Sequence, residues 1–209
     1  KDSIHVPKQC AKNILRHPLD LLVGRSDLFA TRAGLPLDTL FAGRYILPCW
    51  HLNTVQCRFL AWFLLNNLHF RSLGQGECQT LKSLLCIDDS SRFVSKPDTV
   101  FGAGARTSIY LHLLSVLRSS GRGCIFVDQN VESISEDIKG LCNNWLVVGG
   151  IRGTGNQNQV AAAMGLSREQ TAMLGRLQSR EAICSCPTTY PRAIHGFIPE
   201  VPPPAGRTI

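Results

Sequence analysis

The chain has 209 residues, of which 44% are hydrophobic, and this length suffices to bury a full core as a single domain. Its 22 basic and 15 acidic residues give a net charge of +7, which favours an anionic partner but does not choose between nucleic acid and an acidic membrane. No run of about 18 apolar residues is present, so no membrane span is expected, and no secretory signal is visible.

Residues 1–43 predict an N-terminal helical arm, and residues 44–48 predict a short strand that stops near Pro48, since proline cannot donate to a strand ladder. Asn53 is a good N-cap for the helix that follows, because apolar residues from Val55 to Leu68 recur at helical spacing. A loop with two glycines, over residues 71–79, leads to a strand over residues 81–87.

The second half alternates between helices and strands. Residues 90–104 predict an exposed loop; helices are expected over 106–119, 133–141, 157–164 and 167–177, and strands over 124–127 and 145–148. Ser167 and Gln170 form a capping-box pattern. Closing strands over 181–186 and 192–198 can pair, and residues 199–209 predict an extended tail. We therefore expect an α/β fold over residues 44–198: a mainly parallel sheet flanked by helices, with a C-terminal strand pair.

Nine cysteines cannot all pair within one chain, because the number is odd. Several lie inside apolar runs, among them Cys86, Cys124 and Cys184, and free cysteine packs as a small apolar side chain. The pattern predicts reduced core thiols in a cytoplasmic protein. A metal site at Cys184, Cys186 and His195 is disfavoured, since no second cysteine pair has zinc spacing.

The strand over residues 81–87 runs directly into two carboxylates, Asp88 and Asp89. Its unbroken apolar run is typical of a strand buried on both faces, and open α/β sheets bind ligands at the carboxyl ends of such strands. In nucleoside triphosphatases, acids at this place hold the water shell of magnesium and orient the attacking water. The same dipeptide is also common as a helix cap or turn, so the pattern alone leaves both interpretations open.

Five segments together resemble the later part of the HerA/FtsK-type P-loop ATPases, a superfamily of hexameric DNA-pumping motors. They are, in order, Leu84–Asp89, Gly121–Gln129, Trp145–Val148, Ala161–Ser167 and Phe197–Glu200. None is specific alone, but their order and spacing match over roughly residues 21–201. The resemblance implies a RecA-like ATPase core with ATP and Mg²⁺ as cofactors.

The resemblance also implies individual roles. Asp88 would bind the magnesium shell, Asp89 would orient water, and Gln129 would contact the γ-phosphate and that water. An arginine from a neighbouring subunit would stabilise the transition state, and the candidates are, in order, Arg152, Arg106 and Arg92. Double-stranded DNA would meet basic loops facing the pore of a homo-oligomeric ring, expected to be a hexamer, through phosphate contacts from Arg71, Lys96 and Arg106.

Two features depart from the family pattern. Asp89 stands where glutamate is usual, and its shorter side chain predicts slow turnover, since general-base catalysis depends on hydrogen-bond reach. No Gly-x-x-x-x-Gly-Lys-Ser/Thr loop is present, and the glycine-rich segment Gly102–Ser108 has neither a lysine nor a buried strand before it. We expect a preceding portion of the protein to supply the phosphate loop, so residues 1–209 alone should not hydrolyse ATP.

Three functions remain open from the sequence. The first is part of an ATP-driven motor that moves double-stranded DNA. The second, motivated by Asp89 and the missing loop, is a degenerate ATPase-fold scaffold or DNA-binding module without hydrolysis. The third is an unrelated α/β binding domain in which the aspartate pair is a cap; a structure with Asp88 far from Gln129 would favour it.

Overall fold

The computed structural model describes residues 34, 36–73, 76–94 and 107–202, with side chains from residue 113 onward in the helix that starts at 107. The expectations for residues 1–33, for most of the loop over 90–104 and for the end of the tail lie outside these residues. Among the helices of the described ranges, none combines the length and apolar character needed to cross a membrane.

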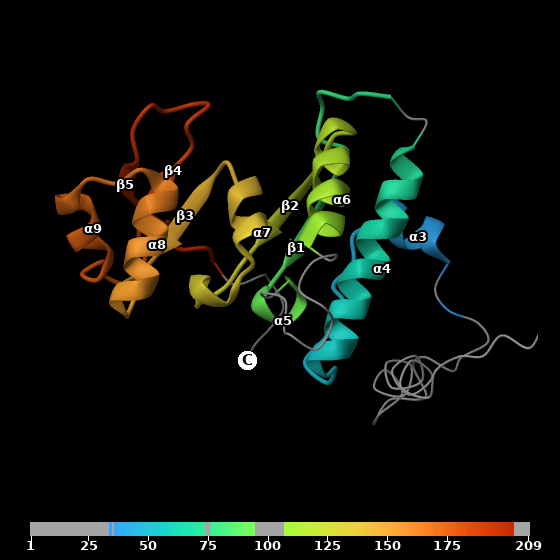
Figure 1. The fold of residues 1–209 in the computed structure, drawn as a ribbon, viewed down its shortest axis with the longest axis horizontal. Coiled ribbons are helices and arrows are strands. Elements are labelled where there is room, and N and C mark those ends of the chain that lie inside the picture. Colours follow the sequence, from blue (N-terminus) through green and yellow to red (C-terminus); the bar gives the residue numbers. More distant parts are fainter. Residues whose placement is uncertain (1–33, 35, 74–75, 95–106, 203–209) are drawn as a thin grey trace, which may run out of the picture.

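Helices and strands alternate along the described chain (Figure 1). In order they are α3 (Leu37–Ala42), α4 (Thr54–Ser72), β1 (Ser83–Ile87), α5 (Ser91–Val94), α6 (Thr107–Ser119), β2 (Arg122–Phe126), the 3₁₀ helix η2 (Val131–Ser133), α7 (Glu136–Leu141), β3 (Trp145–Val148), α8 (Thr154–Met164), α9 (Arg168–Leu174), β4 (Glu181–Ser185) and β5 (Ile194–Phe197). The expected α/β fold class is confirmed.

The strands form two hydrogen-bonded sheets. β1 and β2 pair in parallel, with Ile87 opposite Phe126, and β3, β4 and β5 pair antiparallel in that order. The closing strand pair is thus confirmed as β4 and β5. The expectation that β3 would join the same parallel sheet is not met, because β3 pairs with β4; its short apolar run predicts burial but carries no information on the direction of its partner.

The strand expected over residues 44–48 is wrong. Residues 44–49 have no regular secondary structure and join no ladder of the described residues, and Ile46 is 94% exposed. A short run of apolar residues can predict a strand, but a strand also needs a partner edge, and Pro48 removes one donor from this segment.

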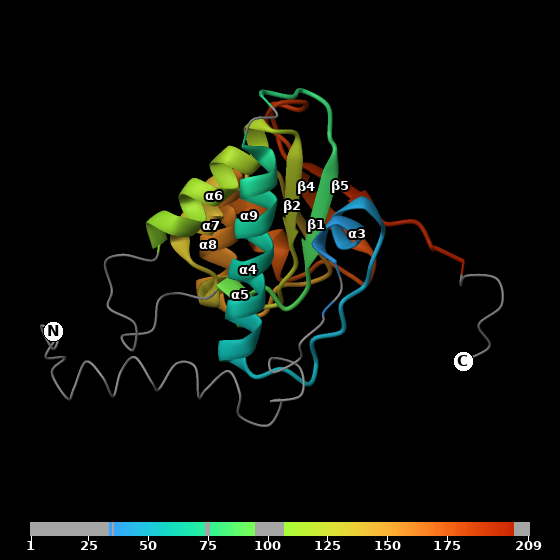
Figure 2. The same ribbon diagram turned by 90° about the vertical axis from the view of Figure 1, so that its right-hand side faces the viewer.

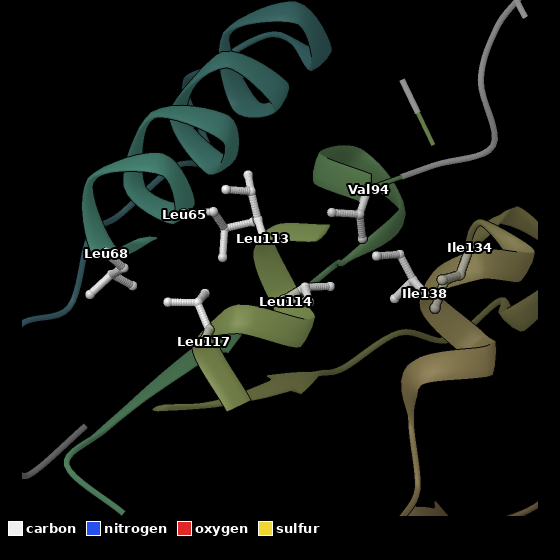
Figure 3. Close-up of a cluster of buried hydrophobic side chains, with 8 residues drawn as sticks. All are labelled: Leu65, Leu68, Val94, Leu113, Leu114, Leu117, Ile134 and Ile138. Atoms are coloured by element: carbon white, nitrogen blue, oxygen red, sulfur yellow. The ribbon is translucent and has the colours of Figure 1, made fainter. Parts of the chain in front are cut away.

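The helices α4, α6, α7, α8 and α9 all lie on one side of the strand layer (Figure 2). Two apolar cores fill the space between. The first lies under β1 and β2 and contains Leu65, Leu117 and Ile138 among its buried residues (Figure 3). The second lies under β3 and β4 and contains Val147, Leu174 and Ile183.

Local signals in the sequence set several element ends. Asn53 and Gln56 form a capping box at the start of α4, and Ser167 and Gln170 form the expected one at α9. Gly121 turns the chain from α6 into β2 with φ +75°, and a Cβ at this position would collide with the carbonyl oxygen of Thr80. Only glycine adopts this conformation there without strain.

Two expectations about β1 and its surroundings are wrong. The strand is buried on one face only, since Leu84 is 49% exposed and Cys86 is exposed. The expected loop after it also begins with a short helix, α5. The reason for the first error is physical: an apolar run shows that a strand needs cover on both faces, but not that the described residues provide it.

Candidate functional site

The two parallel strands end at the same edge of the sheet. β1 stops at Ile87 and continues into Asp88 and Asp89, while β2 stops opposite it at Phe126 and leads into Asp128 and Gln129. The sequence predicted these polar groups at the carboxyl ends of neighbouring parallel strands, and that placement of the strands is confirmed. Ligands of open α/β sheets bind at such an edge.

Ser90 fastens the two strand ends together. Its backbone N–H donates to the carbonyl oxygen of Val127 (3.0 Å), and its hydroxyl lies 2.8 Å from the carbonyl oxygen of Ile87 and 2.9 Å from that of Val127. The residue is fully buried. A buried hydroxyl whose bonds are satisfied fixes the geometry of its neighbours, so Ser90 holds the Asp88–Asp89 segment against the chain that leads to Gln129.

Asp128 makes a second connection across the same edge. Its carboxylate accepts hydrogen bonds from the backbone N–H of Ser91 (2.6 Å) and from that of Asn130 (2.8 Å). It therefore caps the first turn of α5 from the neighbouring strand. The sequence analysis missed both Ser90 and Asp128; the available signal was an acid at the end of the second strand opposite a serine-rich turn.

The cap interpretation of Asp88 and Asp89 is weakened by these contacts. The N–H at the start of α5 donates to Asp128, whereas Asp88 accepts a hydrogen bond, among the described residues, only from the N–H of Asp89 (3.0 Å). Both acids are exposed, and Asp89 has the left-handed φ of 48°, which is uncommon outside glycine. Within the described residues, their carboxylates remain available to solvent and to a ligand.

Gln129 is exposed at the start of the loop that precedes η2, and no described residue binds its amide. The next residue, Asn130, caps η2 by accepting the N–H of Glu132 (3.2 Å). The same N–H also lies 3.1 Å from Oδ1 of Asn156 in α8. The loop after Gln129 is thus anchored on both sides, while the Gln129 amide makes no hydrogen bond to the part of the chain that the structure describes.

The arginine candidates differ in their surroundings. Arg152 lies exposed in the loop between β3 and α8, where Gly149 and Gly153 have positive φ angles of 71° and 89°. Arg92 instead donates from Nη2 to the carbonyl oxygen of Leu52 (2.6 Å) and ties α5 to the start of α4. Arg106 lies outside the described residues. Of the two candidates that the structure describes, Arg152 is therefore the one whose guanidinium no described residue binds.

Of the three candidates for DNA contact, only Arg71 is among the described residues. Its guanidinium pairs with the carboxylate of Asp38 and lies over the ring of Phe41, 5.2 Å from the ring centroid. These contacts hold α3 on α4 and give Arg71 a structural role. Lys96 and Arg106 belong to the part of the chain that is not described.

No group of three or more histidine, cysteine or acidic side chains in the described ranges is arranged to hold a metal ion. This includes the surroundings of Cys184, Cys186 and His195. Magnesium makes a smaller demand, because it keeps several waters and binds through one or two carboxylates and substrate phosphates. A single exposed carboxylate at Asp88 fits that requirement.

No protein-family model matches the sequence, and no curated protein matches it significantly. Solved structures do resemble the fold. The genome packaging NTPase B204 from Sulfolobus turreted icosahedral virus 2, in complex with AMPPCP, matches with a TM-score of 0.55 and 15% identity over 80% of this chain and 73% of its own. Its complex with ATP-gammaS gives a TM-score of 0.52. VirB4 of Thermoanaerobacter pseudethanolicus matches with a TM-score of 0.53 and 14% identity over 74% of this chain.

The chain spans 40% of the length of that VirB4 structure. At 14–15% identity, this likeness to VirB4 and to a genome packaging NTPase concerns the fold, and at that level the resemblance stated from the sequence is confirmed.

Proposed function

We propose that this chain is part of an ATP-driven motor that couples ATP hydrolysis to the movement of double-stranded DNA, with its nucleotide site at the carboxyl edge of β1 and β2. The observation that carries the proposal is the parallel pairing of these strands, which brings the tail Asp88–Asp89 beside the tail containing Gln129. The fold, shared with a genome packaging NTPase seen with ATP analogues, supports it.

Each residue at the edge has a proposed task. Asp88 would hold the water shell of Mg²⁺, whose charge neutralises the phosphates, and Asp89 would orient the attacking water. Gln129, whose amide no described residue binds, would contact the γ-phosphate and the same water. Phosphoryl transfer depends on such positioning and on charge stabilisation, because the protein forms no covalent bond to the phosphate.

The DNA and the ring belong to the same proposal. The net charge of +7 suits phosphate contacts that bind DNA without reading its sequence. Lys96 and Arg106 are proposed for these contacts, with Arg71 in third place because Asp38 and Phe41 already engage it. Arg152 is proposed to reach the nucleotide of the adjacent copy in a hexameric ring in the cytoplasm.

A second function is favoured by one observation. Asp89, in place of the usual glutamate, has a shorter reach and follows Asp88 in a left-handed backbone conformation. A degenerate module that keeps the fold and binds DNA or partner proteins without hydrolysis would tolerate this change. Hydrolysis by the complete protein decides between the two.

The test measures ATP hydrolysis by a longer polypeptide, which also contains the residues encoded before residue 1. We expect turnover that depends on Mg²⁺ and rises with double-stranded DNA, while residues 1–209 alone remain inactive for want of a phosphate-binding lysine and its cradle of backbone N–H groups. A longer polypeptide that binds nucleotide but never hydrolyses it would instead support the degenerate module.

The role of Asp89 has its own test in that polypeptide. Asp89→Ala should lower kcat by about 10²–10⁴-fold, the usual contribution of a general base, and leave nucleotide affinity nearly unchanged. Asp89→Glu should raise kcat if the shorter acid limits the reaction. Equal kcat values for Asp89→Ala and the unchanged protein would remove Asp89 from the reaction.

A further inference from the structure

The helix α4 is apolar on its outer side as well as on its inner side. Its 19 residues include two arginines and no acidic residue. Residues that recur every three or four positions share one face of a helix. The residues on the face opposite the buried one, which we call the outer stripe, are Val55, Phe59, Trp62, Phe63, Asn66, Phe70 and Leu73. Asn66 is the one polar member of this set.

Several large side chains of the outer stripe are in contact with solvent. Trp62, Phe70 and Leu73 are 41%, 65% and 55% exposed. The ring of Phe59 lies 6.0 Å from that of Trp62 and 6.2 Å from that of Phe63, measured between centroids, so the aromatic residues form a continuous surface. A helix that is apolar all round is usually buried, and an exposed aromatic patch marks a contact with protein.

The position of α4 leaves room for such a contact. It is the outermost long helix beyond β1, at one end of the molecule (Figures 1 and 2). Its inner face packs against α5 and α6, with Leu65 and Leu68 in the shared core. The outer stripe points away from that core, because it lies on the other side of the helix.

The chain before α3 enters the described structure beside the outer stripe. The guanidinium of Arg71, in the last turn of α4, pairs with the carboxylate of Asp38 and lies over the ring of Phe41, so α3 is held at this end of α4. Phe70 is exposed at the same end. A helix rises 1.5 Å per residue, so the stripe from Phe59 to Phe70 is about 17 Å long and residues 18–33, as a helix, would span about 24 Å.

The sequence of residues 18–33 suits a helix with one apolar face. Leu19, Leu22 and Phe29 recur at intervals of three and seven residues, which is helical spacing. Pro18 is compatible with the first turn of a helix. A single helix of this length is marginal in water, and Gly24 weakens it further, so it needs an apolar partner.

We propose that residues 18–33 form a helix that packs on the outer stripe of α4 and covers Trp62 and Phe70. Both elements belong to one chain and are joined through α3, which is fixed at the end of α4. Their contact is therefore intramolecular, and its effective concentration is of millimolar order. The proposal concerns α4 alone, so a protein without ATPase activity would leave it unaffected.

A second copy of the chain fits this surface less well. A helix of 19 residues is about 28 Å long and about 10 Å wide, so its outer side offers roughly 300 Å². A stable interface between two separate proteins buries about 800 Å² on each partner. The outer stripe is thus the right size for one helix and too small to hold two molecules together.

The test places the photo-reactive residue p-benzoylphenylalanine at position 70 of the full 209-residue chain. After irradiation, peptide mass spectrometry identifies the segments that the probe captures. The matched control carries the same probe at Phe197 in β5, which is 71% exposed at the opposite end of the molecule (Figure 1). We expect the probe at 70 to capture residues 18–33 at least about tenfold more often than the probe at 197, because the contact is intramolecular.

A mixture of isotope-labelled and unlabelled protein separates capture within one chain from capture between two chains. Two results would overturn the proposal. The first is capture of residues 18–33 by the probe at 70 no more often than by the probe at 197. The second is capture mainly between labelled and unlabelled chains, which would assign the outer stripe to a second copy.

A matched pair of variants identifies the face of the covering helix. Leu22→Glu places a charge in the proposed contact and should lower capture by the probe at 70 at least about tenfold, because an unpaired carboxylate is costly to bury. Thr31→Glu adds the same charge nine residues further on, about two and a half turns away and thus on the opposite face, and should leave capture unchanged. Undiminished capture in the folded Leu22→Glu protein would contradict the proposed packing.

Discussion

At the scale of single residues, Ser90 and Asp128 decide how the two strand ends meet. Removing the Ser90 hydroxyl should cost only about 1 kcal/mol, because the carbonyl groups of Ile87 and Val127 still accept backbone N–H bonds. Asp128→Ala removes a charged acceptor from two N–H groups and should cost about 2–3 kcal/mol. Urea unfolding of both variants checks this order; a larger loss for Ser90→Ala than for Asp128→Ala would contradict it.

Two cysteines should show opposite thiol reactivity. Burial raises the pKa of the Cys124 thiol to about 12, helped by Cys142 and Cys86 nearby, so almost no thiolate forms below pH 10. Hydrogen bonds with Thr189 and Thr188 lower the pKa of the Cys186 thiol. Iodoacetamide at pH 7.5 should therefore modify Cys186 before Cys124, and Cys124 only after unfolding. Early labelling of Cys124 would show that its surroundings are open.

At the scale of elements, the turn between α6 and β2 depends on Gly121. Gly121→Ala should cost at least about 1–2 kcal/mol, because a side chain at φ +75° is strained and its Cβ would meet the carbonyl oxygen of Thr80. Gly140→Ala in α7 is the matched control: a Cβ there meets nothing within 4 Å, so stability should rise by about 0.5–1 kcal/mol. Thermal unfolding measures both, and equal effects would refute the argument.

The elements also show what the sequence can and cannot predict. Helix starts at Asn53 and Ser167 and the strand over 145–148 were predictable, because capping boxes and apolar runs are local signals. The antiparallel pairing of β3 and the absence of a strand over 44–48 were not, since both depend on which edges are available in the folded chain. The end of β1 at Asp88 and Asp89 was predictable, because the apolar run before it is a local signal. The hydrogen bond from the N–H of Ser91 to Asp128 was not, because it joins two segments that are distant in the sequence.

At the scale of the whole molecule, two cores are joined by contacts outside the sheets. η2 and α7 connect with α8 through the N–H of Glu132 and Asn156, and through Lys139 and Gln159, whose Nζ and Oε1 atoms lie 2.8 Å apart. Because no ladder joins β2 to β3, these contacts and the apolar residues around them set the relative position of Gln129 and Arg152.

The most direct test of the proposed nucleotide site is steady-state ATP hydrolysis by the longer polypeptide carrying Asp88→Ala. The matched control is Glu77→Ala, an exposed acid just before the opposite end of β1. We predict that Asp88→Ala abolishes Mg²⁺-dependent turnover, because the magnesium shell loses its carboxylate, and that Glu77→Ala leaves it unchanged. Normal turnover with Asp88→Ala in a folded protein would contradict the assignment of this sheet edge as the site of ATP hydrolysis.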